Sequence, residues 1–363
     1  MCANRATPSP SFWNGKLVCV TGGTGFLGYH LVRALLAARA RVRVLALRPA
    51  GPHPLVDEPR IECVFGDVRD ASVVGPAMAG CNVIFHTAAT VAVWGPALER
   101  MHSIHLDGTR QVLAAADPSA RVVHTSSLVA VGASHDGVPL TEESPFDLEN
   151  LRLDYVQSKR DSERLALAAA AQERDVVVTN PGYLVGPDDF EKSVMGRLCR
   201  RFWKGRLLIA PPGGVNLVDV RDVARGHLLA AEHGQTGRRY LLGGENRTFS
   251  EFFRDLAEVA GLRPRAIPRS PAWALQGLAG LAECHSWLTK KEPYPSFQHV
   301  RLNRLHWYCR SDRAERELGY RARPLAECLA DTFRWYAAQD GLELHHVNRW
   351  WMRPQRQRLP SVA

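Results

Sequence analysis

A tyrosine and a lysine four positions apart, Tyr155 and Lys159, are the residues whose spacing most directly suggests chemistry. On a helix, side chains four positions apart share a face, so the phenol and the ammonium would point to one region. A nearby cation favours the phenolate and lowers the pKa of a tyrosine from about 10 towards neutrality. Ser127, which follows an apolar stretch, could hold a substrate oxygen beside this phenol. The three residues predict proton transfer to or from an oxygen, although such a pair also occurs by chance on amphipathic helices.

A glycine-rich turn near the start of the chain is the second feature that suggests chemistry. Gly22, Gly25 and Gly28 follow the apolar run 17–20 and open an Ala- and Leu-rich helix predicted over 27–38. Gly22 would allow a tight turn, Gly25 a close approach of backbone to a pyrophosphate, and Gly28 tight packing of the helix on the strand. The unpaired N–H groups and the positive dipole end of the helix would bind the phosphates. The other residues of the predicted phosphate-binding turn are Thr24, Phe26 and Leu27.

The end of the second predicted strand, 41–47, distinguishes between two cofactors. A carboxylate there binds the ribose 2′-hydroxyl of NAD, whereas an arginine accommodates the 2′-phosphate of NADP. The sequence has no acidic residue at this position and carries Arg48, with Arg43 close by. NADP is therefore expected, with NAD as the alternative. Both arginines could instead be surface residues that only flank the strand.

Residues that end the next two predicted strands are expected to contact the cofactor as well. Asp67 could accept a hydrogen bond from the adenine amino group, although it could equally be a turn or cap residue. Thr87, Ala88 and Ala89 have the small side chains that are needed where backbone passes close to a bound ring. The remaining positions of the predicted cofactor site, next to these and later motifs, are Val68, Pro181 and Gly182.

Strands and helices alternate along most of the chain, which predicts a Rossmann-type, doubly wound parallel sheet of the α/β class. The expected strands are 17–20, 41–47, 61–65, 82–86, 121–125, 175–180, 215–218, 239–242 and 265–268. Beyond Pro181 the alternation loosens, which predicts a smaller, mostly helical C-terminal substrate lobe. The expected organisation is a disordered lead-in (1–14), a dinucleotide-binding domain (15–187 and 214–244), a substrate lobe (188–213 and 245–339) and a basic C-terminal tail (340–363).

Composition limits the partners and the location of the protein. The net charge of +9 would attract anionic cofactors, but it is too dispersed to predict nucleic-acid binding. The 8 cysteines show neither a C-x-x-C pair nor zinc-type spacing, so we expect no metal and a reducing, cytoplasmic environment. The apolar segment near Trp273 is too short to cross a bilayer, so no stable membrane insertion is expected. Association with a membrane surface through this segment and Lys290-Lys291 is an alternative, although a buried lobe explains the pattern equally well.

The order of these motifs resembles that of the extended short-chain dehydrogenase/reductase superfamily. The motifs are the glycine turn, Gly66-Asp67, His86-Thr87-Ala88-Ala89, Thr125-Ser126-Ser127 and the pair Tyr155 and Lys159, followed by Asn180-Pro181, Gly186-Pro187, 218–224 and 240–244. The likeness covers residues 16–335 and is greatest to the dihydroflavonol 4-reductase group, with its 3β-hydroxysteroid dehydrogenase and hopanoid-associated epimerase relatives. It implies that Tyr155 is the acid/base, that Lys159 tunes it and holds the nicotinamide ribose, and that Ser127 orients the carbonyl.

One position departs from the pattern of this family. The helix after the fourth strand usually carries N-V-x-G-T, in which the asparagine supports a proton relay, whereas this chain has His105 at that place. The imidazole could make the same hydrogen bonds, or the relay could run through water.

The residues around the predicted centre favour one reaction. Related dehydratases need an acidic pair just after the catalytic hydroxyl, and Leu128 and Val129 stand there instead. The predicted substrate pocket is mostly apolar and consists of Thr90, Trp94, Ser127, Tyr183, Val194 and Trp203. We therefore expect NADPH-dependent reduction of a ketone, or the reverse oxidation of an alcohol, on a mostly apolar cyclic small molecule.

Three alternatives stay open at this stage. An NAD-dependent nucleotide-sugar epimerase would use the same tyrosine, lysine and serine. A non-catalytic cofactor-binding sensor is a further alternative, although such relatives typically lack the tyrosine or the lysine. Family members often pair through two helices, which are expected here at 98–116 and 155–172, so a homodimer is also considered.

Overall fold

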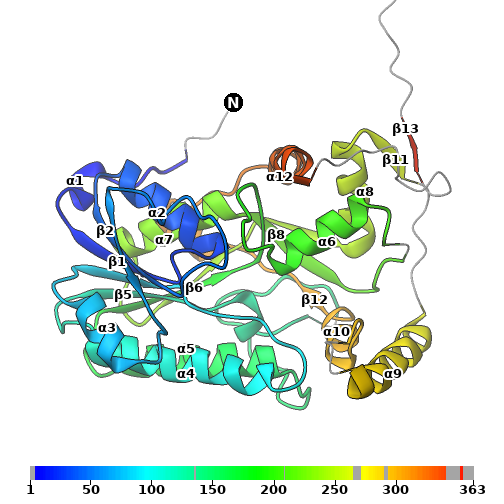
Figure 1. Ribbon diagram of the computed structural model, residues 1–363, viewed down its shortest axis with the longest axis horizontal. Coiled ribbons are helices and arrows are strands. Elements are labelled where there is room, and N and C mark those ends of the chain that lie inside the picture. The colour runs from blue at the N-terminus through cyan, green and yellow to red at the C-terminus, as the bar shows by residue number, and fades with distance from the viewer. Residues whose placement is uncertain are drawn as a thin grey trace, which may run out of the picture.

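Seven parallel strands form the central sheet, in the order β3-β2-β1-β4-β5-β6-β9 (Figure 1). The computed structural model describes residues 5–134, 136–207, 209–264, 271–289, 293–340 and 352–354. The strands are β1 (Leu17–Thr21), β2 (Arg41–Ala46), β3 (Ile61–Phe65), β4 (Val83–His86), β5 (Arg121–Thr125), β6 (Val176–Pro181) and β9 (Arg239–Leu242). Every residue of β4 and β6 is buried, as expected for parallel strands covered on both faces. The predicted Rossmann-type α/β fold is confirmed.

Helices cover both faces of this sheet. Figure 1 shows α2 (Phe26–Ala37) and α7 (Val220–His233) packed together on one face. The opposite face carries α3 (Ala71–Met78), α4 (Ala97–Ala115) and α5 (Asp154–Ala170), and α4 packs along α5. These crossover helices bring the carboxyl ends of the strands to one edge, where the chemistry-bearing residues gather.

A second, smaller sheet links the Rossmann domain to the lobe. It contains β7 (Tyr183–Val185), β8 (Gly214–Asp219), β10 (Glu245–Thr248) and β12 (His306–Trp307). β8 was assigned to the dinucleotide-binding domain from its place in the sequence, but it pairs with β7, β10 and β12 instead. The chain re-enters the main domain only at α7. The sequence could not show this, because β8 is buried at every residue like a strand of the main sheet.

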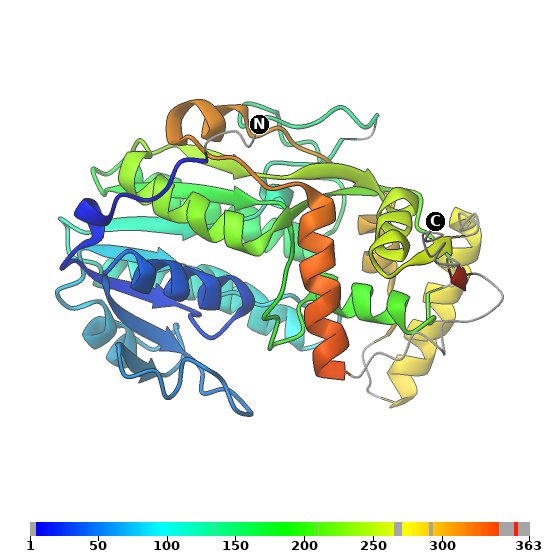
Figure 2. The same ribbon diagram turned by 90° about the horizontal axis from the view of Figure 1, so that it is seen from above.

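Helices make up most of the lobe, and α12 crosses beside the small sheet (Figure 2). Apart from α7, the helices after β7 are α6 (Val194–Trp203), α8 (Phe249–Val259), α9 (Ala272–Thr289), α10 (Phe297–Leu302), α11 (Asp312–Leu318) and α12 (Leu325–Asp340). Of these, α11 packs on α7 and β9 and so belongs spatially to the Rossmann domain. β11 (Leu262–Pro264) pairs with β13 (Met352–Pro354). The strand expected at 265–268 and most of the tail lie outside the described residues.

The lead-in departs from the expected disorder over its described part, residues 5–14. Residues Pro10–Trp13 form the short helix α1, and Trp13 is fully buried against Phe85. The backbone N–H of Ser9 donates to Glu232 Oε1 at 3.0 Å, and the indole N–H of Trp13 donates to the same carboxylate. A large aromatic side chain fixes this segment in spite of its Pro- and Ser-rich composition.

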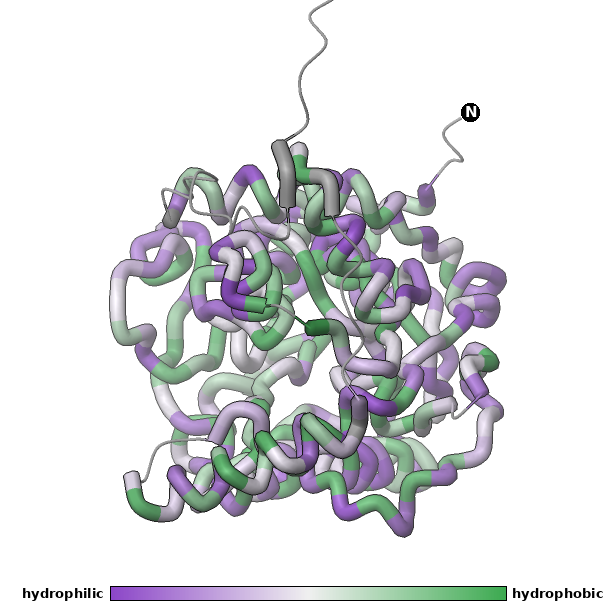
Figure 3. The backbone as a smooth tube through the Cα atoms, turned by 90° about the vertical axis from the view of Figure 1, so that its right-hand side faces the viewer, coloured by the Kyte–Doolittle hydropathy of each residue, from purple (hydrophilic) through white to green (hydrophobic). Residues whose placement is uncertain are grey.

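One helix of the lobe leaves a large apolar surface in water. In α9, Trp273 is 76% exposed and Leu288 is 85% exposed, so the helix is not buried in the lobe. Figure 3 views the molecule from the side on which this helix lies. None of the helices in the described residues combines the length and the apolar character needed to cross a membrane. Lys290 and Lys291, the proposed basic flank, lie outside those residues.

Candidate active site

The glycine turn lies at the carboxyl end of β1, between β2 and β4. Gly22 has a φ of +67°, and a Cβ on it would lie 2.8 Å from the backbone of Ala88. A Cβ on Gly28 would lie 2.2 Å from the carbonyl oxygen of Gly22, so only glycine lets α2 pack this closely on the strand. Gly25 is the N-cap residue of α2, and no side chain caps the helix there. The open backbone N–H groups and the room kept by the glycines fit a dinucleotide pyrophosphate.

A threonine network ties the ends of β1 and β4 together beside this turn. The hydroxyl oxygen of Thr21 accepts hydrogen bonds from the backbone N–H groups of Thr87 and Ala88, each at 3.1 Å. Thr87 in turn donates to the Thr21 carbonyl at 2.6 Å. Since the Thr21 oxygen already accepts twice, its own O–H donates to His86 Nδ1 at 2.9 Å. The predicted cofactor residues Thr87 and Ala88 thus stand at a fixed edge next to Gly22.

The charged residues of the predicted cofactor site have different surroundings. The Arg43 guanidinium pairs with Glu62 at 2.8 Å and donates to carbonyl groups at the end of α3, which is the surface role considered for it. Arg48 is exposed just beyond the end of β2, and its guanidinium lies 4.3 Å from the centre of the Phe65 ring. The Asp67 carboxylate forms a two-oxygen ion pair with Arg69, which lowers its pKa.

Ser127 and Tyr155 meet at the carboxyl end of β5. Ser127 is the N-cap of the short 3-10 helix η1 (Leu128–Ala130), where its hydroxyl accepts from the Val129 backbone N–H at 3.4 Å, and it stands close to the Tyr155 phenol at the start of α5. Burial raises the pKa of Tyr155, and the nearby Ser127 hydroxyl acts in the opposite direction. Lys159, which the spacing predicts to lower this pKa, is not among the groups that shift it. The phenol is therefore protonated at neutral pH.

Lys159 lies one turn further along α5 and is almost fully buried. Its Nζ donates to the Thr125 carbonyl at 3.1 Å, and its side chain is only 5% exposed. Burial lowers its pKa from 10.5 to about 8, while the nearby Glu163 carboxylate opposes that shift. The ammonium is thus still mainly charged at neutral pH, but it is poised to lose its proton in mildly alkaline solution.

His105, which replaces the asparagine of the family pattern, forms hydrogen bonds through both ring nitrogens. Its Nε2 accepts from the Thr90 backbone N–H at 3.3 Å, so the proton must reside on Nδ1, which lies 2.9 Å from Ser158 Oγ. Its ring also packs edge-on to Tyr155, with centroids 6.1 Å apart. Burial, and then the charge of Lys159, lower the pKa of His105 to about 2. The imidazole is therefore a neutral, fixed spacer between α4, α5 and the loop after β4.

The residues of the predicted substrate pocket have different surroundings in the structure. Burial raises the pKa of Tyr183, and the nearby Tyr155 raises it further. Trp203 does not line a pocket: it is 1% exposed, and its indole N–H donates to the Leu256 carbonyl at 2.9 Å. The sequence predicts Trp203 in the pocket wall as an apolar residue, but the helix that carries it packs on α8. Val194 is 43% exposed at the start of α6.

Two polar residues missed from the sequence support the centre from behind. The Asn180 amide donates to the Ser127 carbonyl at 3.0 Å and to Glu163 Oε2 at 2.6 Å. Glu163 is four residues after Lys159, so helical spacing could have placed it on the same face. Asn180 belongs to the Asn180-Pro181 motif of the family resemblance. Its contact with Ser127 joins β6 to the end of β5, so neighbouring residues in the sequence could not predict it.

The Rossmann-type sheet carries a glycine turn after β1, Ser127 after β5, and Tyr155 and Lys159 on α5. This combination is typical of enzymes that bind a nicotinamide dinucleotide. The model of the NAD dependent epimerase/dehydratase family matches residues 18–243. The chain belongs to this family, within the extended short-chain dehydrogenase/reductase superfamily, and is an NAD(P)-dependent enzyme.

Known proteins similar to the chain extend over nearly its whole length. A Synechocystis protein provisionally named dihydroflavonol 4-reductase is 35% identical over 87% of this chain and 93% of its own length. The human 3 beta-hydroxysteroid dehydrogenase type 7 is 30% identical over 84% of this chain and 91% of its own. The crystal structure of gox2253 superposes with a TM-score of 0.76 at 30% identity, covering 90% of this chain and 99% of that one.

Proposed function

We propose that the protein reduces a ketone with NADPH, or oxidises the corresponding alcohol, on a mostly apolar cyclic substrate. The observation that carries this proposal is that Ser127 stands close enough to the Tyr155 phenol to lower the pKa of that phenol, while Lys159, one turn further along α5, is buried. Two O–H donors at one point suit a carbonyl oxygen that gains negative charge. The names of the dihydroflavonol reductase and hydroxysteroid dehydrogenase relatives agree with a carbonyl or alcohol on a ring.

In the proposed reduction, Tyr155, Ser127 and Lys159 each have a different role. When bound, the nicotinamide supplies the hydride. Tyr155 donates its proton to the substrate oxygen, and its raised pKa keeps that proton available at neutral pH. Ser127 orients the same oxygen by a second hydrogen bond. Lys159, through its positive charge, stabilises the phenolate that Tyr155 becomes, and it would also hold the nicotinamide ribose.

The residues after Ser127 favour reduction over elimination. Leu128 and Val129 are 0% and 2% exposed, respectively, and so belong to the core of the domain. No carboxylate therefore stands at this point to remove a proton next to the substrate carbonyl, as a dehydratase requires. The proposal of NADP as the cofactor rests on Arg48 and on the lack of an acidic residue at the end of β2.

A matched pair of variants tests the proposed reaction. Tyr155→Phe removes only the phenolic oxygen, and Tyr294→Phe removes the same atom from a tyrosine that is 52% exposed in the lobe. Turnover is followed by NADPH absorbance across a panel of cyclic ketones. We expect Tyr155→Phe to lower kcat by about 10²- to 10⁴-fold, as for loss of a general acid. Tyr294→Phe should match the wild type, and equal turnover by both variants would remove Tyr155 from the mechanism.

The epimerase alternative makes a different prediction about the cofactor. An epimerase returns the hydride to its own substrate and so retains its NAD, whereas a reductase must exchange NADP for NADPH at each turnover. Identification of the nucleotide in the purified protein separates the two. Tightly held NAD would favour the epimerase, and freely exchanging NADP would favour the reductase. Exchangeable binding without turnover of any ketone would favour the sensor.

A further inference from the structure

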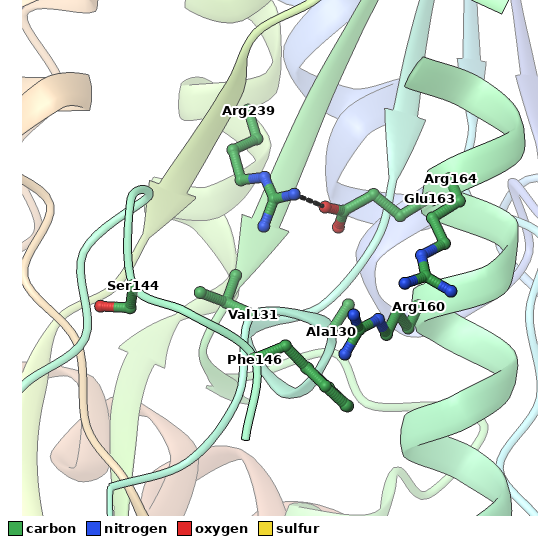
Figure 4. A pocket seen from close by; sticks show the side chains of 8 residues that line it. All are labelled: Ala130, Val131, Ser144, Phe146, Arg160, Glu163, Arg164 and Arg239. Carbon is green, nitrogen blue, oxygen red and sulfur yellow. Dashed lines mark ion pairs between the residues drawn. The ribbon is translucent and has the colours of Figure 1, made fainter. Parts of the chain in front are cut away.

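A cavity lined by basic side chains lies between α5, β9 and the loop after η1 (Figure 4). Its volume is about 180 Å³. Three guanidinium groups and one carboxylate line it, from Arg160, Arg164, Arg239 and Glu163. The lining therefore carries an excess of two positive charges at neutral pH. None of the three arginines takes part in the proposed reaction.

The single carboxylate of the lining neutralises only one of these arginines. Glu163 is 2% exposed, and its Oε1 pairs with Arg239 at 3.0 Å. Its Oε2 accepts from the Asn180 amide at 2.6 Å, on the side away from the cavity towards Ser127. Because both oxygens already have partners, Glu163 does not pair with Arg160 or Arg164.

Arg160 is held rigidly by an aromatic ring. Its guanidinium lies 3.4 Å from the centre of the Phe146 ring, and Nη1 donates to Glu149 at 3.0 Å. Glu149 is outside the cavity lining and its side chain is 58% exposed, so solvent screens this ion pair. Stacking fixes the plane of the guanidinium but leaves N–H groups at its edge for another acceptor.

Arg164 is weakly paired and adds a repulsive charge. Its nearest carboxylate is Asp161, one turn back on α5, at 3.9 Å, and the Arg164 side chain is 62% exposed. Burial, and then the charge of Arg164, lower the pKa of Arg160. Two like charges therefore meet at this cavity, and an anion placed between them would relieve the repulsion.

We propose that this cavity binds a small oxyanion that carries a phosphate or a carboxylate group. The planar guanidiniums of the lining match the oxygen geometry of both groups. A pocket of about 180 Å³ suits a single anionic group rather than a dinucleotide. The site is separate from the glycine turn and does not depend on the proposed reaction.

The test compares two arginines in the same kind of local ion pair. Arg164→Gln removes one charge of the cavity, while Arg110→Gln removes an arginine of α4 that is 55% exposed and pairs with Asp107 three residues earlier. Inorganic phosphate and succinate are titrated into the full-length protein by calorimetry, with chloride keeping the ionic strength constant. Because one charge-assisted hydrogen bond is lost, we expect Arg164→Gln to weaken binding about tenfold and Arg110→Gln to leave it unchanged.

The two probes separate the chemical sources of the anion. Saturable binding of phosphate, of succinate or of both, weakened by Arg164→Gln alone, supports the site and names the group it recognises. Arg164→Lys keeps the charge but loses the planar fork, so its affinity should fall between those of the wild type and Arg164→Gln. Phosphate bound at the glycine turn would be equal in all variants. No saturable binding, or equal affinity of Arg164→Gln and Arg110→Gln, overturns the proposal.

Discussion

Replacing Lys159 by methionine should stabilise the protein while it abolishes turnover. When the pKa of a lysine is lower in the folded state than in the unfolded state, its positive charge lowers the free energy of unfolding. Below the folded pKa of about 8 the protonated side chain pays the full burial penalty. As the pH rises from about 8 to 10.5, the unfolded chain holds more protons than the folded one, so the stability of the wild type increases. Methionine has a similar length and no charge.

The size of the effect follows from the pKa and the contacts of this lysine. The fall from 10.5 to about 8 corresponds to about 3 kcal/mol, at about 1.4 kcal/mol for each pKa unit. Methionine also loses the hydrogen bond from Lys159 to the Thr125 carbonyl, which offsets about 1 kcal/mol. We therefore expect Lys159→Met to raise the free energy of unfolding by about 2 kcal/mol near pH 7. Near pH 9.5, where the folded lysine is mostly neutral, that advantage should almost vanish.

Urea unfolding of the cofactor-free protein at these two pH values measures the effect. Lys192→Met, at an exposed lysine, is the control for the loss of a lysine charge outside the core, and it is measured at the same two pH values. Only the difference between each variant and the wild type is used, so other titrating groups cancel. A Lys159→Met protein that is less stable than the wild type near pH 7, or whose advantage does not depend on pH, would refute the reasoning. The same variant should lose about 10²-fold or more in kcat.

Three further predictions concern residues whose surroundings the structure makes explicit. Trp203→Ala should lower the free energy of unfolding by about 3 to 5 kcal/mol in urea titrations, because it empties a core site; an effect on substrate KM alone would return Trp203 to the pocket wall. Arg48→Gln should weaken NADP binding about tenfold and leave NAD binding unchanged in calorimetry, and equal losses for both would contradict the proposed preference. His105→Ala should reduce stability and kcat, with partial rescue by His105→Asn. The pH profile of kcat should keep its shape between about pH 5 and 8, because the imidazole stays neutral there.

The main sheet and the glycine turn were predictable because their signals are local. From β1 to α2 the chain forms a buried strand, a turn that only glycine can make and a helix, one directly after the other. Each of these elements can therefore be predicted from residues close to it in the sequence. The same holds for Tyr155 and Lys159, which helical spacing alone puts on one face. β8 was misassigned because the partner of a strand is chosen across the chain, and its buried residues suit either sheet.

Trp203 and Trp13 show the limit of composition as a guide. Trp203 is predicted in the pocket wall as one of several apolar residues, and Trp13 falls in a lead-in that its Pro- and Ser-rich composition predicts to be disordered. Each is fully or almost fully buried and donates its indole N–H to a partner far away in sequence, Leu256 for Trp203 and Glu232 for Trp13. A tryptophan needs both an apolar site and one acceptor, and only the folded chain shows whether the two coincide.

Burial is also what the sequence could not supply at the candidate active site, and it acts against an expectation there. From spacing alone, a lysine beside a tyrosine should move the tyrosine pKa from about 10 towards neutrality. In the folded protein, the low polarity that surrounds both groups raises the pKa of Tyr155 and lowers that of Lys159, so each moves towards its neutral form. A protonated phenol is the form that can give a proton to a carbonyl oxygen, and in the proposed reduction the Lys159 ammonium would then stabilise the phenolate. The direction of the two shifts therefore favours Tyr155 as an acid, and it makes the alcohol oxidation the direction that should gain from alkaline pH.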